Sequence, residues 1–214
     1  MTNKIADPLG ILGGTFDPIH NGHLQIAASI IDATSVNTIK FMPCYLPVHR
    51  PEPESIVNDR VAMIKLALES SSLSLDEREI RRKSPSYMID SLISLREDFP
   101  LHPLCLILGA DAYQNIITWK KWQELLEYAH LIIINRPHFP FKLHPHPLLA
   151  KHETQNPNDI RTHLAGSILF LAIPPCPISA TSIRQKIKNN EDITALVPRK
   201  VADYIHQHDL YRND

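Results

Sequence analysis

Short apolar runs that alternate with amphipathic stretches most constrain what this chain can fold into. Each run is nearly continuous, which is typical of strands buried on both faces of a sheet. Such runs predict strands over 9–12, 38–42, 104–108, 130–135 and 168–173. The amphipathic stretches predict helices at about 23–34, 58–70, 85–98, 112–128, 181–188 and 198–207. This alternation predicts an α/β fold, a doubly wound parallel sheet with helices on both faces.

Length and charge narrow the classes of function. The chain has 214 residues, which favours a single domain over 1–214, with a helical portion from about 179. Its 22 Lys and Arg residues nearly balance its 23 Asp and Glu residues. That balance argues against a protein that binds a nucleic acid polymer over a broad basic surface. A small pocket for a phosphorylated ligand is compatible with it.

The cysteine and hydropathy patterns indicate the compartment. Cys44, Cys105 and Cys176 lie far apart with no C-x-x-C, which is typical of free thiols in a reducing compartment. No apolar run reaches the roughly 18 residues of a membrane span, and the first ten residues lack the apolar stretch of a secretory signal. We therefore expect a cytoplasmic protein without a membrane partner. Its oligomeric state stays open, and a homo-oligomer is one of the options.

The segment from Gly13 to His23, GGTFDPIHNGH, carries the strongest chemical signal. An apolar run leads into two glycines, a turn and an amphipathic stretch. Glycines let the backbone approach a ligand closely, and a helix start presents N–H groups to an anion. His20 and His23 are three residues apart and share a helix face, so both can donate to phosphate oxygens. A tight turn with capping histidines is the alternative, and a zinc pair is disfavoured because no third ligand is evident.

Three further segments have an expected place near this turn. The proline-rich stretches 43–53 and 136–147 follow predicted strands and read as extended loops. Ligands of open parallel sheets bind at the carboxyl ends of the strands, so both loops are expected to form a rim. Near the C-terminus, Ser179 or Thr181 is expected to cap a helix, and Arg184, one turn in, to reach a phosphate. An ordinary capped helix is the alternative.

These motifs resemble two signatures of the nucleotidyltransferase superfamily with the H-x-G-H motif. The first is G-G-T-F-D-P-x-H-x-G-H, and the second is ISATSIR at 178–184. Other stretches resemble the bacterial nicotinate-nucleotide adenylyltransferase family over essentially the whole chain: PSYMID at 85–90, Gly109-Ala110-Asp111, Trp119 with Trp122, His130 with Asn135-Arg136-Pro137, and Leu210-Tyr211. The resemblance implies a Rossmann-like fold. It also implies that ATP and nicotinate mononucleotide react to deamido-NAD and pyrophosphate, in NAD biosynthesis.

The resemblance also implies roles for individual residues. His20, His23 and Arg184 are the catalytic candidates, two histidines on the ATP phosphates and an arginine on the leaving pyrophosphate. The remaining ATP-binding candidates are Gly13, Gly14, Thr15, Phe16, Gly109, Asp111, Ser179 and Thr181. The candidates for binding the mononucleotide are His49, Arg50, Ser86, Tyr87, Met88, Trp119 and Arg136. Magnesium is expected to enter with ATP, with no protein metal site.

The chemistry expected of such a site is positioning and charge stabilisation. A phosphomonoester has a pKa near ~6, so the attacking phosphate is mostly dianionic at neutral pH and needs no general base. No covalent enzyme intermediate is expected. Two rival functions stay open: another nucleotidyltransferase of the superfamily, such as the phosphopantetheine enzyme, and a nucleotide-binding regulatory module without turnover.

Several residues have a plainer alternative or depart from the family pattern. Asp111 is also a candidate N-cap, and Trp122 is expected in the core. Val48, Met88, Ala180 and His138 stand where the family usually has other residues, and Met88 is the one expected to affect the nicotinate pocket. Two groups are interpreted as solvent-exposed: the loop histidines His144, His146 and His152, and the charged cluster at 76–83.

Overall fold

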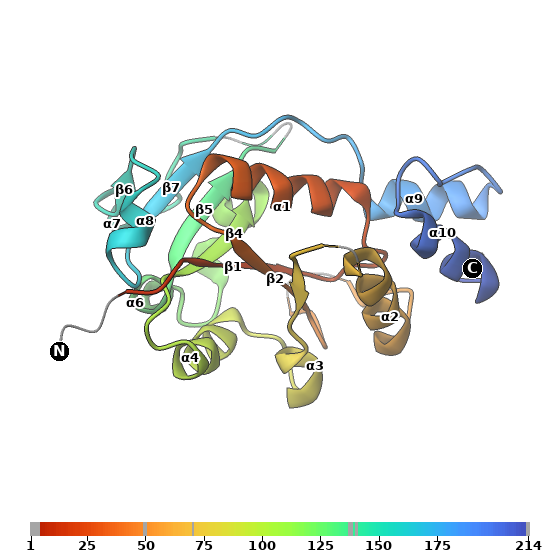
Figure 1. Cartoon of the computed structure of the whole chain (residues 1–214), viewed down its shortest axis with the longest axis horizontal. Coiled ribbons are helices and arrows are strands. Elements are labelled where there is room, and N and C mark those ends of the chain that lie inside the picture. The colour runs from red at the N-terminus through yellow and green to blue at the C-terminus, as the bar shows by residue number, and fades with distance from the viewer. Residues whose placement is uncertain (1–4, 49–50, 70, 137–138, 140, 213–214) are drawn as a thin grey trace.

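A seven-stranded, all-parallel sheet forms the centre of the computed structural model, which describes residues 5–48, 51–69, 71–136, 139 and 141–212 (Figure 1). Its strand order is β3-β2-β1-β4-β5-β7-β6. The strands are β1 (Leu9–Gly14), β2 (Thr38–Pro43), β3 (Ser74–Leu75), β4 (Leu104–Gly109), β5 (His130–Ile134), β6 (Glu153–Thr154) and β7 (Ile168–Leu171). The predicted α/β fold with a parallel sheet is confirmed.

Helices cover both faces of the sheet. Figure 1 shows α1 and α4 on opposite sides, with α9 and α10 together at the C-terminal end. The helices are α1 (Asn21–Ala33), α2 (Val57–Leu68), α3 (Arg78–Arg82), α4 (Met88–Asp98), α5 (Ala110–Gln114), α6 (Leu125–Tyr128), α7 (Pro147–Ala150), α8 (Asp159–Thr162), α9 (Ala180–Lys188) and α10 (Arg199–Gln207). Among the described residues, no helix is long and apolar enough to cross a membrane.

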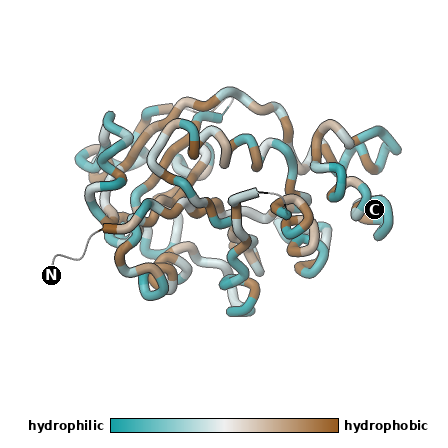
Figure 2. The backbone as a smooth tube through the Cα atoms, in the orientation of Figure 1, coloured by the Kyte–Doolittle hydropathy of each residue, from teal (hydrophilic) through white to brown (hydrophobic). Residues whose placement is uncertain are grey.

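The sheet buries both of its faces because successive strand residues point to opposite sides. On β4, Leu106 and Leu108 join one hydrophobic core with α4, whereas Cys105 and Ile107 join the other with α1, α2, α9 and α10. In Figure 2 the strands at the centre of the molecule are among its most hydrophobic stretches. This two-sided burial explains why the apolar runs are continuous rather than alternating.

The helix predicted over 112–128 is wrong in its continuity. The chain forms α5, two 3₁₀ turns, η1 (Ile116–Thr118) and η2 (Trp122–Glu124), and then α6. Trp119 is extended at φ −78° and ψ 146°, and Lys121 adopts a left-handed conformation at φ 53°. Neither conformation can continue a helix. The apolar spacing reflects residues that pack on one face through a sequence of short turns.

The charged cluster at 76–83 is not simply a solvated surface, which corrects the sequence interpretation. Asp76 and Glu79 are buried. The Arg78 guanidinium donates to Asp76 Oδ1 and Oδ2 at 3.0 and 2.9 Å. Glu79 accepts from Ser91 Oγ at 2.6 Å. The Glu79–Ser91 bond connects α3 to α4, and the Arg78–Asp76 pair closes the start of α3, so these residues are more than a solvated helix face.

The loop histidines are half-buried and hydrogen-bonded, so the interpretation of them as solvent-exposed is also wrong. His144 bridges the Tyr113 hydroxyl at 2.7 Å and a Glu153 carboxylate oxygen at 2.9 Å. The ring of His152 lies 2.8 Å from the Gly166 carbonyl oxygen, and His146 caps α7 by accepting from the Leu148 N–H. His144 therefore attaches the proline-rich loop to α5 and to the edge strand β6, while His146 and His152 hold the segment around α7 in place.

We predict that Gly10→Ala destabilises the protein. A Cβ at position 10 of β1 would lie 2.8 Å from Ile39 Cγ1 and 3.0 Å from Val36 Cγ1, both on fully buried side chains. Overpacking of this kind costs about 1–3 kcal/mol. Urea unfolding measures the loss. Adding Ile39→Ala should relieve the clash, so the double variant should lose less than the sum of the single losses. Wild-type stability of Gly10→Ala would contradict the packing described here.

Candidate active site

A cavity of about 490 Å³ opens at the carboxyl ends of β1 and β4. The chain leaves β1 toward β2 on one side, and β4 lies on the other, so the cavity sits where the strand order reverses. Open α/β sheets bind ligands at this position. The cavity walls come from five segments. They are the turn from Gly13 to His20, called the glycine turn below, the loop after β2, the start of α4, the end of β4 and the start of α9.

The cavity gathers all but three of the site residues predicted from the sequence. Lining it are Gly13, Gly14, Thr15, Phe16, His20, His23, Ser86, Tyr87, Met88, Gly109, Asp111, Trp119, Arg136, Ser179 and Thr181. Arg184 lies outside the lining. His49 and Arg50 lie outside the described residues. Both proline-rich loops contribute to the rim as predicted, through Pro47 and Val48 and through Arg136 and Phe139.

Glycines keep the cavity open at the ends of both central strands. A Cβ at Gly13 would lie 3.0 Å from Met88 Cε. A Cβ at Gly109 would lie 2.3 Å from Asp111 Oδ1 and 2.9 Å from Arg136 Nε. Any side chain at 109 would therefore displace the polar groups of this wall. Asp111 is in the first turn of α5 and Gly109 is its N-cap, so the alternative of Asp111 as the cap is wrong.

The two histidines lie together at the start of α1. His20 is the N-cap residue, and its ring stacks on that of His23 with centroids 3.7 Å apart. The His20 backbone N–H donates to Nδ1 of His23 at 3.2 Å. Because Nδ1 of His23 accepts, its proton resides on Nε2, where it can be donated to a ligand. Burial and, second, the positive charge of Arg136 lower the pKa of His20 to about 4, so His20 is neutral at pH 7.

Three residues that shape this turn had no role predicted for them from the sequence: Gly22, Asp17 and Arg60. Gly22 leaves room for the His20 ring, which a Cβ there would approach to 3.0 Å. Asp17 is buried, and its carboxylate accepts from the Glu54 N–H at 2.8 Å, the Ser55 N–H at 3.2 Å and the Ser55 hydroxyl. Arg60 of α2, fully buried, donates to the carbonyls of Thr15 and Cys44 at 2.7 and 2.9 Å. The period of a helix does not reveal that one arginine points inward.

The start of α9 carries the second predicted motif. Ser179 is the N-cap, and its hydroxyl accepts from the Ser182 N–H at 3.1 Å. Arg184, one turn later, donates through Nε to Glu54 Oε1 and through Nη1 to the Asp17 carbonyl, both at 2.7 Å. The guanidinium is therefore attached to the glycine turn by way of Asp17.

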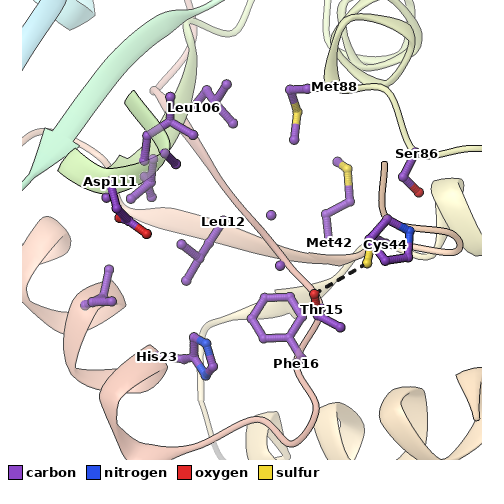
Figure 3. Close-up of a pocket in the computed structure, with 18 of the residues that line it drawn as sticks. Leu12, Thr15, Phe16, His23, Met42, Cys44, Ser86, Met88, Leu106 and Asp111 are labelled. Carbon is purple, nitrogen blue, oxygen red and sulfur yellow. Dashed lines mark hydrogen bonds between the residues drawn. The ribbon is translucent and has the colours of Figure 1, made fainter. Parts of the chain in front are cut away.

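The opposite wall consists of the segment before α4. Ser86 N–H donates to the Leu46 carbonyl at 3.0 Å, and Tyr87 N–H lies 3.1 Å from the Pro85 carbonyl oxygen. Asp90 N–H returns to Tyr87, so Met88 and Ile89 carry the helix's first amides, the positions that lack an intrahelical acceptor. Figure 3 shows Met88 and Ser86 on one side of the cavity, with His23 and Asp111 on the other. Trp119 also lines it.

Comparisons with known proteins agree with this geometry. A family model described as cytidylyltransferase-like matches residues 11–186. Probable nicotinate-nucleotide adenylyltransferases from Aeromonas salmonicida and Coxiella burnetii are each 41% identical, over 97% and 95% of this chain and 98% of theirs. Nicotinic acid mononucleotide adenylyltransferase from Plasmodium falciparum, solved with NaAD, superposes with a TM-score of 0.75 at 21% identity, over 98% of this chain and 99% of that one.

Fold, cavity and full-length similarity thus agree on one assignment, and it confirms the resemblance found in the sequence. The reaction is the transfer of the adenylyl group of ATP to nicotinate mononucleotide, which yields nicotinate adenine dinucleotide and pyrophosphate. The chain belongs to the nicotinate-nucleotide adenylyltransferases of the cytidylyltransferase-like family.

Proposed function

We propose that both substrates occupy the cavity between β1 and β4, with the ATP phosphates against the glycine turn and the nicotinate ring beside α4 and Trp119. One observation carries this proposal: the residues predicted for both substrates, from segments far apart in the chain, line a single cavity. Asp111 and Arg136, whose side chains lie 3.7 Å apart, are proposed to contact adenosine (Asp111) and a phosphate or ribose (Arg136). His49 and Arg50 are proposed as further contacts to the mononucleotide.

Catalysis in this arrangement comes from positioning and from hydrogen bonds to phosphate. His20, as a neutral imidazole, and His23 donate to ATP phosphate oxygens, and the N–H groups at the start of α1 add their dipoles. The mononucleotide phosphate attacks the α-phosphorus and pyrophosphate leaves. Arg184 acts on the charge of that leaving group. No general base or covalent intermediate is required, because the attacking phosphate is already mostly dianionic.

Magnesium enters this scheme with ATP. Within the described residues, no three His, Cys, Asp or Glu side chains gather as a metal site, and the phosphate oxygens of the nucleotide are hard oxygen ligands suited to Mg²⁺. The ion supplies charge neutralisation on the phosphates when bound. We further propose that the chain works as one cytoplasmic nucleotidyltransferase domain, and that any oligomer formed is a homo-oligomer.

We predict that His20→Ala or His23→Ala lowers kcat by about 10²–10³, the usual loss for one charge-stabilising donor. A pyrophosphate-release assay measures it. His146→Ala is a matched control, since His146 is likewise an N-cap histidine but caps α7 outside the cavity. Its kcat should stay at the wild-type value. Near-normal turnover in both cavity variants would contradict the phosphate-binding role.

The low pKa of His20 predicts a pH-dependent stability. The unfolded histidine binds a proton near pH 6.5, whereas the folded one does so only near pH 4. Its contribution is therefore fully present above pH 6.5 and is lost as the pH falls toward 4. At about 1.4 kcal/mol per pH unit, the loss approaches about 3 kcal/mol. Urea unfolding between pH 4 and 7 measures how the free energy of unfolding changes with pH. This dependence on pH should be weaker in His20→Gln than in the wild type, and equal dependences would be inconsistent with a buried neutral His20.

We predict that nicotinate mononucleotide is preferred over its amide by more than about tenfold in kcat/KM. The amides of Met88 and Ile89 are donors only, so a carboxylate can accept from both. A carboxamide that turns its NH₂ toward one of them leaves a buried donor unpaired, at about 1–3 kcal/mol. The comparison uses both mononucleotides with ATP and magnesium, with phosphopantetheine as a third acceptor. Equal values for acid and amide would show that Met88 has changed the pocket, and turnover of phosphopantetheine would favour the rival transferase.

A further inference from the structure

The side chain of Tyr211 reaches the glycine turn from the last residues of the chain. Tyr211 follows α10 and is 7% exposed. Its hydroxyl donates to Asp17 Oδ1 at 2.8 Å and lies 2.9 Å from Ser55 Oγ. Burial, followed by the negative charge of Asp17, raises the pKa of this phenol, so the hydroxyl keeps its proton and stays a donor. The bond joins residues 194 positions apart.

Asp17 is hydrogen-bonded to both Tyr211 and Arg184. The Asp17 carboxylate is 4% exposed and receives the Ser55 hydroxyl and two backbone N–H groups besides the Tyr211 hydroxyl. The backbone carbonyl of the same residue accepts from Arg184 Nη1 at 2.7 Å, and that nitrogen lies 3.8 Å from Asp17 Oδ2. Any shift of Asp17 therefore moves the backbone carbonyl that accepts from Arg184.

We propose that Tyr211 is a positioning residue for adenylyl transfer, acting through Asp17 on the guanidinium of Arg184. Tyr211 does not line the cavity and touches no substrate in the proposed arrangement. Its hydroxyl is one of four hydrogen-bond donors to the Asp17 carboxylate, together with the Glu54 N–H, the Ser55 N–H and the Ser55 hydroxyl. The inference rests on the proposed role of Arg184 at the leaving pyrophosphate.

Loss of the hydroxyl deprives a buried carboxylate of one donor. In Tyr211→Phe, Asp17 shifts, and Arg184 keeps its bond to Glu54 but loses the fixed position of the Asp17 carbonyl. The expected result is a drop in kcat of about tenfold or more, in the range for hydrogen bonds to charged groups, with KM for both substrates within about twofold of wild type. Inhibition by added pyrophosphate should weaken as well, because Arg184 would no longer be aimed at it.

Tyr204→Phe is the matched control. Tyr204 lies on the preceding helix, and its hydroxyl donates to Asp59 Oδ1 at 2.9 Å, the same hydroxyl–carboxylate bond between the C-terminal region and the body of the protein. Asp59 lies on α2 and does not line the cavity. Tyr204→Phe should lower the melting temperature and leave kcat unchanged. A purely structural Tyr211 would behave in the same way, and that result for Tyr211→Phe would overturn the proposal.

A double-mutant cycle tests whether the effect passes through Arg184. Arg184→Ala alone should lower kcat, and adding Tyr211→Phe to it should cost no further kcat. An equal loss in both backgrounds would overturn the route through Arg184. Wild-type kcat in Arg184→Ala would instead refute the role of Arg184 itself and, with it, the positioning by Tyr211. If Tyr211→Phe does not fold, Ser55→Ala removes the other hydroxyl on Asp17, and the same cycle applies to it.

Discussion

Two buried charges hold the turn on which the site depends. The Arg60 guanidinium binds two backbone carbonyls, at Thr15 and Cys44, and the Asp17 carboxylate collects donors from the 54–55 segment and from Tyr211. Burying a charge is costly unless its hydrogen bonds are made, so each charge accepts only a narrow range of backbone positions. The turn from Gly14 to His20 is thereby fixed from both sides, and His20 starts α1 at a defined place.

The sheet forms the packed core of the protein, and the residues of the site lie at the carboxyl ends of its central strands. Strands β1 and β4 bury apolar side chains on both faces and end in glycines that leave space for ligands. The cavity lies at their carboxyl ends, so its floor is built on buried, fully paired strands. Burial also fixes the protonation state of His20, which is therefore neutral over the physiological pH range. The burial that packs the His20 ring against its neighbours is thus also the main cause of its lowered pKa.

The five longer strands and the two motif-bearing helix starts were predictable from the sequence because their signals are local, whereas the two-residue strands β3 and β6 were not predicted. A continuous apolar run or a G-G followed by two histidines can be recognised within a dozen residues. The broken helix at 110–128 could not be foreseen, because its apolar spacing imitates a helical period while Trp119 and Lys121 leave helical geometry. The roles of Asp17, Arg60 and Tyr211 were missed for another reason: their partners are distant in the chain, and tertiary contact alone gives these polar residues a role.

Both edges of the sheet end in strands of only two residues, β3 and β6. An edge strand exposes N–H and C=O groups that can pair with another chain, and long apolar edges are the starting points of aggregation and strand exchange. Here the long Ile- and Leu-rich strands are all interior, and each edge offers too few residues to hold a foreign strand in register. The enzyme can therefore carry a very apolar parallel sheet without that sheet becoming a template for pairing with its own copies.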